Sequence, residues 1–211
     1  MAFQAPAAPM GDGYPVQVTM TDAREINRLW GIPFLGIFVR YILAIPHALV
    51  LAIMMIGFYV WLFLGWIPIL LLGRQPDLVV KFLTEFMHRG MRTVGYAIFL
   101  MPGGYPPLEP GAPTPLGLEV NVEGRSLNRL WGIPFFGIFV RYILLIPHLI
   151  VFAILAIVAY VSLIVLWIPI LVTGKYPEAF ASYYRSMFRY GSRVFAYLLL
   201  LPVPYPPFSL S

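Results

Sequence analysis

Two long apolar segments constrain the fold of this chain more than any other feature. Residues 41–73 and 142–174 contain no Asp, Glu, Lys or Arg, and apolar runs of more than about 18 residues are typical of membrane helices. Within them, residues 47–67 and 148–168 would each form a helix of about 31 Å, close to the roughly 30 Å thickness of the hydrocarbon layer. We therefore expect an integral membrane protein.

The composition agrees with this expectation. Apolar residues make up 60% of the 211 residues and charged residues 11%, whereas soluble domains carry about 25% charged residues. The absence of cysteine excludes disulfides, thiolate metal sites and cysteine nucleophiles. Residues 1–15 have no basic residue and no sustained apolar core, so they do not resemble a secretory signal and are expected to form a flexible tail.

The chain repeats itself at an offset of 101 residues. Segment 27–47 matches segment 128–148 at all but two positions, and the Trp-Ile-Pro-Ile-Leu sequence at 66–70 recurs at 167–171. Duplicated membrane proteins usually pack their copies around a pseudo-two-fold axis. The sequence predicts four parts, which are a tail at 1–15, a first membrane repeat at 16–108, a Pro/Gly-rich linker at 109–117 and a second membrane repeat at 118–211.

The motifs within each repeat resemble a known family. The first repeat contains RYILAIPH from Arg40, WIPILLLGRQPD from Trp66 and YPP from Tyr105, and each has a counterpart in the second repeat. Together with a short preceding strand, these motifs resemble the prokaryotic membrane family catalogued as domain of unknown function 4389, twice and over nearly the whole chain. The resemblance implies a compact domain in a prokaryotic cytoplasmic membrane, and it supplies no activity, substrate or catalytic residue.

Local patterns predict the remaining elements. Apolar and polar residues alternate over 16–20 and 118–122, which indicates two half-buried strands that can pair across the axis. After each apolar run, a glycine and then a proline followed by an acidic residue indicate the end of one helix and the start of another. The new helices are expected over about 76–101 and 177–201.

The connection between the repeats limits the topology. A Pro/Gly-rich segment such as 102–117 cannot cross lipid, because its peptide groups would lack hydrogen-bond partners. Each repeat then begins and ends on the same side of the membrane. The predicted fold class is an all-α integral membrane protein with two parallel tandem repeats, two membrane helices in each and four in total, and short β-strand segments outside the membrane. Charges in the second helix of each repeat leave open a monotopic alternative with re-entrant helical hairpins.

Six arginines are candidates for binding lipid headgroups or a partner protein. Two lie between apolar stretches, where an arginine is energetically expensive and is commonly paired, functional or extended toward the headgroups. The others lie on the second helix of each repeat, where phosphate binding and plain solvation are equally good explanations. The six are Arg40, Arg141, Arg92, Arg185, Arg189 and Arg193. Tryptophans near the ends of the spans are expected to anchor the protein at the two interfaces, namely Trp30, Trp66, Trp131 and Trp167.

His47 and His148 occupy equivalent positions, each after a proline near the start of a span. A neutral imidazole there can ligate a haem iron or the magnesium of a chlorophyll-type pigment, and the repeat symmetry can bring the two rings together. The alternative is a hydrogen bond to a backbone carbonyl that the proline leaves unpaired. No other pattern supports a metal site, and no cofactor is predicted.

The candidate residues do not predict an enzyme. Gly-rich phosphate loops, nucleophile elbows, zinc-ligand spacings and paired carboxylates in the apolar runs are absent from the sequence. The first hypothesis is a non-catalytic structural or accessory subunit that packs against a larger membrane protein assembly. The alternatives are a protein that binds or handles lipid or small solutes, and a bis-His haem or pigment protein. Expected partners are membrane lipids, anionic ones included, and other membrane protein subunits, whereas nucleic acid is not expected.

Overall fold

The computed structural model describes residues 13–20, 24–112 and 114–210, so most of the predicted tail lies outside the described residues. Helices dominate these ranges, and the only sheet within them has two strands. The elements of the first repeat are β1 (Val16–Met20), the 3₁₀ helix η1 (Arg28–Gly31), α1 (Leu35–Leu43), α2 (Ile45–Leu64), α3 (Trp66–Leu72) and α4 (Asp77–Ala97). Those of the second are β2 (Leu116–Val120), the 3₁₀ helix η2 (Arg129–Gly132), α5 (Phe136–Thr173) and α6 (Glu178–Leu198).

The apolar run forms one continuous helix in the second repeat and three helices in the first. Helix α5 has 38 residues and keeps two prolines in its interior, although each proline removes a helical hydrogen bond. The first repeat is interrupted at Ala44 and Gly65, shortly before the equivalent prolines. The second repeat has Leu145 and Leu166 at these two positions, both fully buried. Their packing favours the continuous helix, whereas a glycine lowers helix stability.

The second helix of each repeat was predicted correctly. Helices α4 and α6 each have 21 residues, begin directly after a proline and carry an acidic residue in the first turn. Both end three to four residues before the predicted boundaries at 101 and 201. The reason is a reversal of the chain at Leu100 and Leu200, which have φ values of 51° and 55° and therefore cannot continue a right-handed helix.

The two predicted strands form one antiparallel pair, in which Val18 lies opposite Leu118. Strand β2 begins at Leu116, two residues before the predicted start and within the segment assigned to the linker. The register explains this difference, because Leu116 extends the buried face that Val16 and Val18 share with Leu118.

The repeats interlock through their N-terminal segments. Strand β1 packs on α6 and β2 on α4, while η1 packs on α5 and η2 on α3. Backbone hydrogen bonds join the same regions, since the Ile26 amide donates to the Gly174 carbonyl at 3.0 Å and the Leu127 amide donates to the Gly73 carbonyl at 2.7 Å. Each repeat therefore covers the helices of the other, and neither has its full packing alone.

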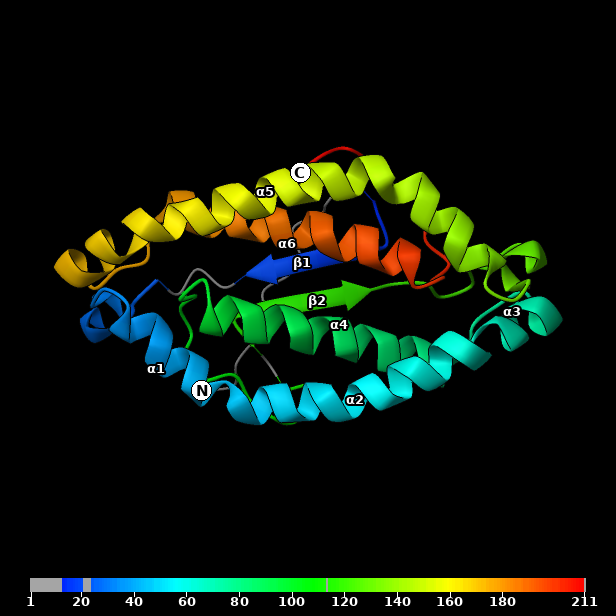
Figure 1. Ribbon diagram of the computed structural model, residues 1–211, viewed down its shortest axis with the longest axis horizontal. Helices are drawn as coiled ribbons and strands as arrows, with labels where there is room; N and C mark the ends of the chain where they lie inside the picture. The colour runs from blue at the N-terminus through cyan, green and yellow to red at the C-terminus, as the bar shows by residue number, and fades with distance from the viewer. Residues whose placement is uncertain (1–12, 21–23, 113, 211) are drawn as a thin grey trace.

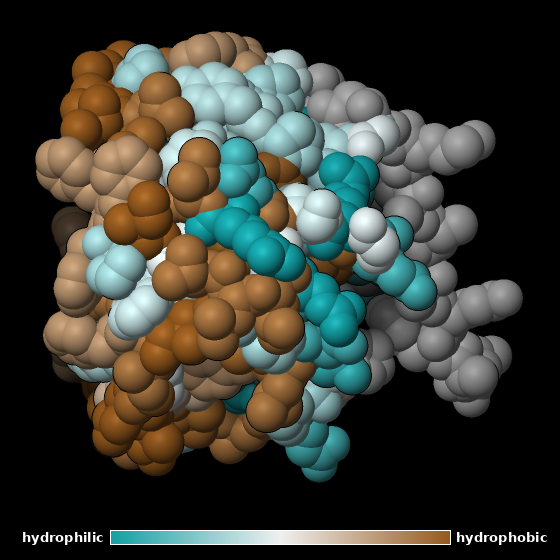
Figure 2. All heavy atoms as spheres, turned by 90° about the vertical axis from the view of Figure 1, so that its right-hand side faces the viewer, coloured by the Kyte–Doolittle hydropathy of each residue, from teal (hydrophilic) through white to brown (hydrophobic). Residues whose placement is uncertain are grey.

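Figure 1 shows the long helices at opposite edges of an elongated molecule, with α4, α6 and the strands between them. The outer surfaces of α2 and α5 are apolar and exposed. Ile53 of α2 is 68% exposed and Ile164 of α5 is 70% exposed. Figure 2 shows apolar residues covering most of one end of the molecule and the side that faces the viewer in Figure 1, while polar residues gather toward the opposite side. The molecule is thus apolar on one side and at its edges.

Among the described helices, α2 and α5 are long and apolar enough to cross a membrane. Helices α4 and α6 are not, because charged residues interrupt their sequences, including Lys81, Glu85, Arg89 and Arg92 in α4 and Arg185, Arg189 and Arg193 in α6. The structure therefore confirms a mostly helical protein with two membrane-capable helices and a small sheet, and does not confirm the four membrane helices predicted from the sequence.

Two glycines test the interlocking of the repeats. A Cβ atom added to Gly31 would overlap the backbone of Leu171, and one added to Gly132 would overlap the backbone of Leu70. We expect Gly31→Ala and Gly132→Ala each to lower the free energy of unfolding by about 1–3 kcal/mol, because overpacking forces the two repeats apart. Thermal unfolding in detergent, followed by circular dichroism, measures this effect.

Gly90→Ala is the matched control. Gly90 lies in α4 with no neighbouring atom within 4 Å of an added Cβ, so alanine there should raise stability by up to about 1 kcal/mol through helix propensity. Equal stability changes at all three glycines would contradict the tight packing of η1 and η2.

Candidate functional site

One buried arginine in each repeat, Arg40 of α1 and Arg141 of α5, joins its helix to the second helix of the same repeat. Arg40 and Arg141 are each only 2% exposed. The Arg40 Nη1 group donates to the carbonyl oxygens of Met101 at 2.9 Å and Tyr96 at 3.3 Å, and Arg141 makes the equivalent bonds in the second repeat at 3.3 and 2.6 Å. Carbonyls at a helix C-terminus have no partner within the helix. The two arginines supply that partner from inside the protein.

Aromatic rings enclose both guanidinium groups. Arg40 lies 4.8 Å from the centroid of the Trp30 ring and 4.7 Å from that of Tyr96. Arg141 has the same arrangement with Trp131, at 5.0 Å, and a tyrosine. Cation–π contacts of this kind are strongest where water is excluded. The structure therefore does not extend Arg40 and Arg141 toward headgroups, and it places two of the expected anchor tryptophans against them.

The other two tryptophans lie near the far ends of the long helices. The Trp66 indole donates to the Phe63 carbonyl at 2.7 Å, and that of Trp167 donates to the Ile164 carbonyl at 2.8 Å. Both rings are half-buried. An anchoring role for Trp66 and Trp167 stays a prediction.

The histidines lie in separate surroundings. His47 Nε2 is 3.0 Å from the Pro106 carbonyl, whereas His148 Nδ1 is 2.7 Å from the Tyr190 hydroxyl. Because α2 and α5 form opposite edges of the molecule (Figure 1), the structure does not bring the two rings together. The described residues also contain no group of three or more side chains arranged to hold a metal ion.

The closing Tyr-Pro-Pro segments cover these histidines, which the sequence did not predict. Tyr105 and Tyr205 each lie edge-on to the histidine of their own repeat, with ring centroids 4.9 Å apart. The recurrence of both motifs, 58 residues apart in the first repeat and 57 in the second, was the available signal. The contact between the two motifs could not be inferred from it, because the contact depends on the chain reversal after α4 and α6.

The arginines of α6 differ in their surroundings. Arg185 is partly exposed and lies 3.5 Å from Glu178, Arg189 Nη2 donates to the Val18 carbonyl at 3.4 Å, and Arg193 is fully buried. The regular spacing predicted one stripe facing phosphate or a protein interior. Strand β1 covers much of that stripe, so Arg185 is the member best placed for contact with headgroups.

An ionic cluster lies on α4 beside the linker. Glu85 Oε1 accepts a hydrogen bond from Arg89 at 2.8 Å and lies 3.6 Å from Arg92 Nη2. His88 Nε2 lies 2.9 Å from the Leu116 carbonyl, and burial lowers the pKa of His88, which keeps the ring neutral at pH 7. One carboxylate therefore faces two guanidinium groups, which leaves one positive charge in excess.

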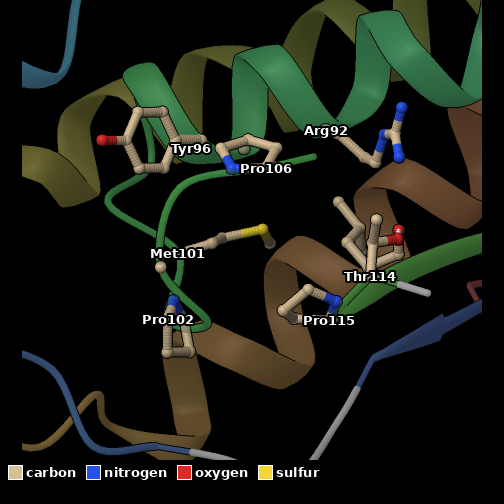
Figure 3. A pocket seen from close by; sticks show the side chains of 10 residues that line it. Arg92, Tyr96, Met101, Pro102, Pro106, Thr114 and Pro115 are labelled. Carbon is tan, nitrogen blue, oxygen red and sulfur yellow. Dashed lines mark hydrogen bonds between the residues drawn. The ribbon is translucent and has the colours of Figure 1, made fainter. Parts of the chain in front are cut away.

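A cavity of about 30 Å³ adjoins this cluster. Figure 3 shows Arg92 and Thr114 on one side of it, Tyr96, Met101 and Pro102 on the other, and prolines above and below. Arg92 is 3% exposed, burial lowers its pKa, and none of its three guanidinium nitrogens has a hydrogen-bond acceptor among the described residues. Arg92 was a predicted site residue, whereas the surrounding Glu85, His88 and Thr114 were missed.

The comparison with protein families identifies the repeated unit. The model of the family described as Domain of unknown function (DUF4389) matches residues 35–107 and 137–209. The chain belongs to this family. The two DUF4389 copies confirm the resemblance seen in the motifs, and each runs from the helix that carries the buried arginine, α1 or α5, through the Tyr-Pro-Pro segment. The strands and 3₁₀ helices that interlock the repeats lie outside both DUF4389 matches. No curated protein and no solved structure matches the chain.

The buried arginines yield a stability prediction. Arg40→Met should lower the free energy of unfolding by about 1–3 kcal/mol, because the Tyr96 and Met101 carbonyls would be buried without a donor. Arg40→Lys should also destabilise, since an ammonium group lacks the planar donor pair and the stacking surface of a guanidinium. Chemical unfolding in detergent micelles measures both changes.

Arg185→Gln serves as the control for loss of one positive charge. Its ion pair with Glu178 is partly exposed, and exposed pairs contribute less than about 1 kcal/mol. If Arg40→Met were no more destabilising than Arg185→Gln, the assigned role of Arg40 would be wrong.

Proposed function

We propose that the protein is a non-catalytic structural or accessory subunit of a prokaryotic membrane, held in one leaflet with lipid acyl chains against the outer surfaces of α2 and α5. The length of α5 carries this proposal. Its 38 residues correspond to about 57 Å, nearly twice the roughly 30 Å of the hydrocarbon layer. A helix of that length fits along a membrane better than across it.

The position of the sheet supports the same orientation. The strands lie near the middle of the long axis of the molecule (Figure 1), and Glu119 of β2 is exposed. If the long axis crossed the membrane, this carboxylate would lie at the depth of the bilayer centre, where an ionised group is very unfavourable. With the long axis in the membrane plane, the apolar side faces hydrocarbon and the opposite side faces water.

The arrangement of the repeats favours this monotopic alternative over four crossings. In Figure 1 the two halves are related by an approximate half-turn about the viewing direction, with α5 and α6 above and α2 and α4 below. Parallel repeats in membrane proteins are related by an axis along the membrane normal. That relation places the long helices in the membrane plane and leaves the polar side available to other subunits of an assembly.

Cysteine labelling tests the orientation, because the native chain has no cysteine. Arg74→Cys, Lys175→Cys and Glu119→Cys place single thiols at exposed positions, the first two at opposite ends of the molecule and the third on the central strand. We expect an impermeant maleimide to reach all three from the same side of the membrane, either all before cell lysis or all only afterwards.

Other labelling patterns identify the competing topologies. Labelling of Arg74→Cys and Lys175→Cys from one side and of Glu119→Cys from the other would establish four crossings. Labelling of the two end positions from opposite sides would place the long axis across the membrane. Gln75→Cys is the matched control, since Gln75 is 3% exposed and should react only after denaturation.

A second measurement tests the role as a subunit. Extraction of the protein from its native membrane in a mild detergent should recover further membrane proteins in a fixed ratio to this chain. The visible spectrum of the same sample should show no haem or pigment absorbance. A lone, stable protein that carries only lipid would contradict the accessory role and favour lipid handling.

A further inference from the structure

Arg92 and Arg193 occupy equivalent positions in the two repeats but have different surroundings. Arg193 of α6 is fully buried, and its guanidinium lies 5.0 Å from the centroid of the Tyr14 ring, with Nε 3.5 Å from the Val16 carbonyl. The Tyr14 hydroxyl in turn donates to the Pro204 carbonyl at 2.8 Å. An aromatic ring from the first repeat thus fills the space beside the arginine of the second.

Arg92 is the equivalent residue of α4, and it lacks this ring. At the 101-residue offset, Tyr14 corresponds to Pro115, which lines the cavity beside Arg92 (Figure 3). A proline is smaller than a tyrosine and brings no aromatic face to a guanidinium. The cavity lies where a tyrosine at position 115 would place its ring if the two repeats were identical.

The charges around Arg92 compensate it only in part. The one acidic group near it is Glu85, at 3.6 Å, which is hydrogen-bonded to Arg89. His88 adds no charge while neutral, and the Thr114 hydroxyl donates to the Leu116 carbonyl at 2.7 Å. A buried guanidinium needs both an opposite charge and hydrogen-bond acceptors. One monovalent anion would supply both and balance the excess charge of the cluster.

We infer that the cavity beside Arg92 binds one small monovalent anion of about the size of chloride. Its volume of about 30 Å³ exceeds the roughly 10–15 Å³ that a single water requires. The anion would accept hydrogen bonds from Arg92 and fill the space between α4 and Pro115 of the linker. The inference is independent of how the protein lies in the membrane.

A chloride titration of the full-length protein in a non-ionic detergent tests the site. Sodium chloride replaces sodium gluconate at constant ionic strength, because gluconate is too bulky for the cavity. We expect the melting temperature to rise and saturate, by about 5 °C when chloride reaches about 100 times its Kd. The ³⁵Cl NMR line should broaden in the presence of the protein, which reports binding without unfolding.

Substitutions separate this site from general salt effects. Arg92→Gln should abolish both the chloride-dependent melting temperature and the line broadening, whereas Arg185→Gln should retain them. Pro115→Tyr should abolish them as well, since it supplies the ring present beside Arg193, and this variant serves if Arg92→Gln does not fold. Chloride effects that persist in both Arg92→Gln and Pro115→Tyr would overturn the assignment. The absence of a chloride effect in the native protein would overturn it as well.

A lipid headgroup could present the same anionic chemistry as a free ion. Mixed micelles containing phosphatidic acid, titrated in gluconate, distinguish this source. A rise in melting temperature that requires phosphatidic acid and Arg92, with no response to chloride, would overturn the binding of a chloride-sized ion and assign the site to a headgroup phosphate. No Arg92-dependent response to either probe would leave ordered water as the occupant and refute the inference.

Discussion

The hydrogen bonds that Arg40 and Arg141 donate to the ends of α4 and α6 set the geometry of both repeats. The free carbonyls at a helix C-terminus in apolar surroundings have no water to donate hydrogen bonds to them. Each arginine donates to one carbonyl in the last turn of α4 or α6 and to one just beyond the helix end, while aromatic rings exclude solvent from its charge. The turn after each second helix, the Tyr-Pro-Pro segment that follows it and the contact with His47 or His148 all depend on this position of the helix end.

The second organising feature is the exchange of N-terminal segments between the repeats. It buries the strands, and it brings Tyr14 beside Arg193 but Pro115 beside Arg92. The two copies have therefore diverged where they contact each other. One copy has a filled site, and the other has, next to a cavity, a guanidinium that shares one carboxylate and has no hydrogen-bond acceptor among the described residues. A duplicated fold can in this way keep one site structural and make the equivalent site available to a ligand.

Much of the fold could be predicted from the chain, because repeats, strand alternation and helix start signals are local patterns. The surroundings of Arg40 could not, because apolar neighbours in sequence are the same whether they face lipid or protein. The breaks at Ala44 and Gly65 could not either, because the equivalent sequence of the second repeat forms one continuous helix. The difference between Tyr14 and Pro115 was visible in the alignment of the copies, but assigning it to Arg193 and Arg92 required knowing that the strands are exchanged.

The exchange also determines when the protein can complete its structure during synthesis. Strand β1 pairs with residues 116–120 and packs on α6, which spans residues 178–198. The first strand to leave the ribosome therefore completes its packing only when the last helix has been synthesised. Contacts this distant in sequence form slowly. Until residues 116–120 emerge, β1 has no strand to pair with, and until α6 arrives, the face of β1 that packs on this helix stays exposed to other proteins in the cell.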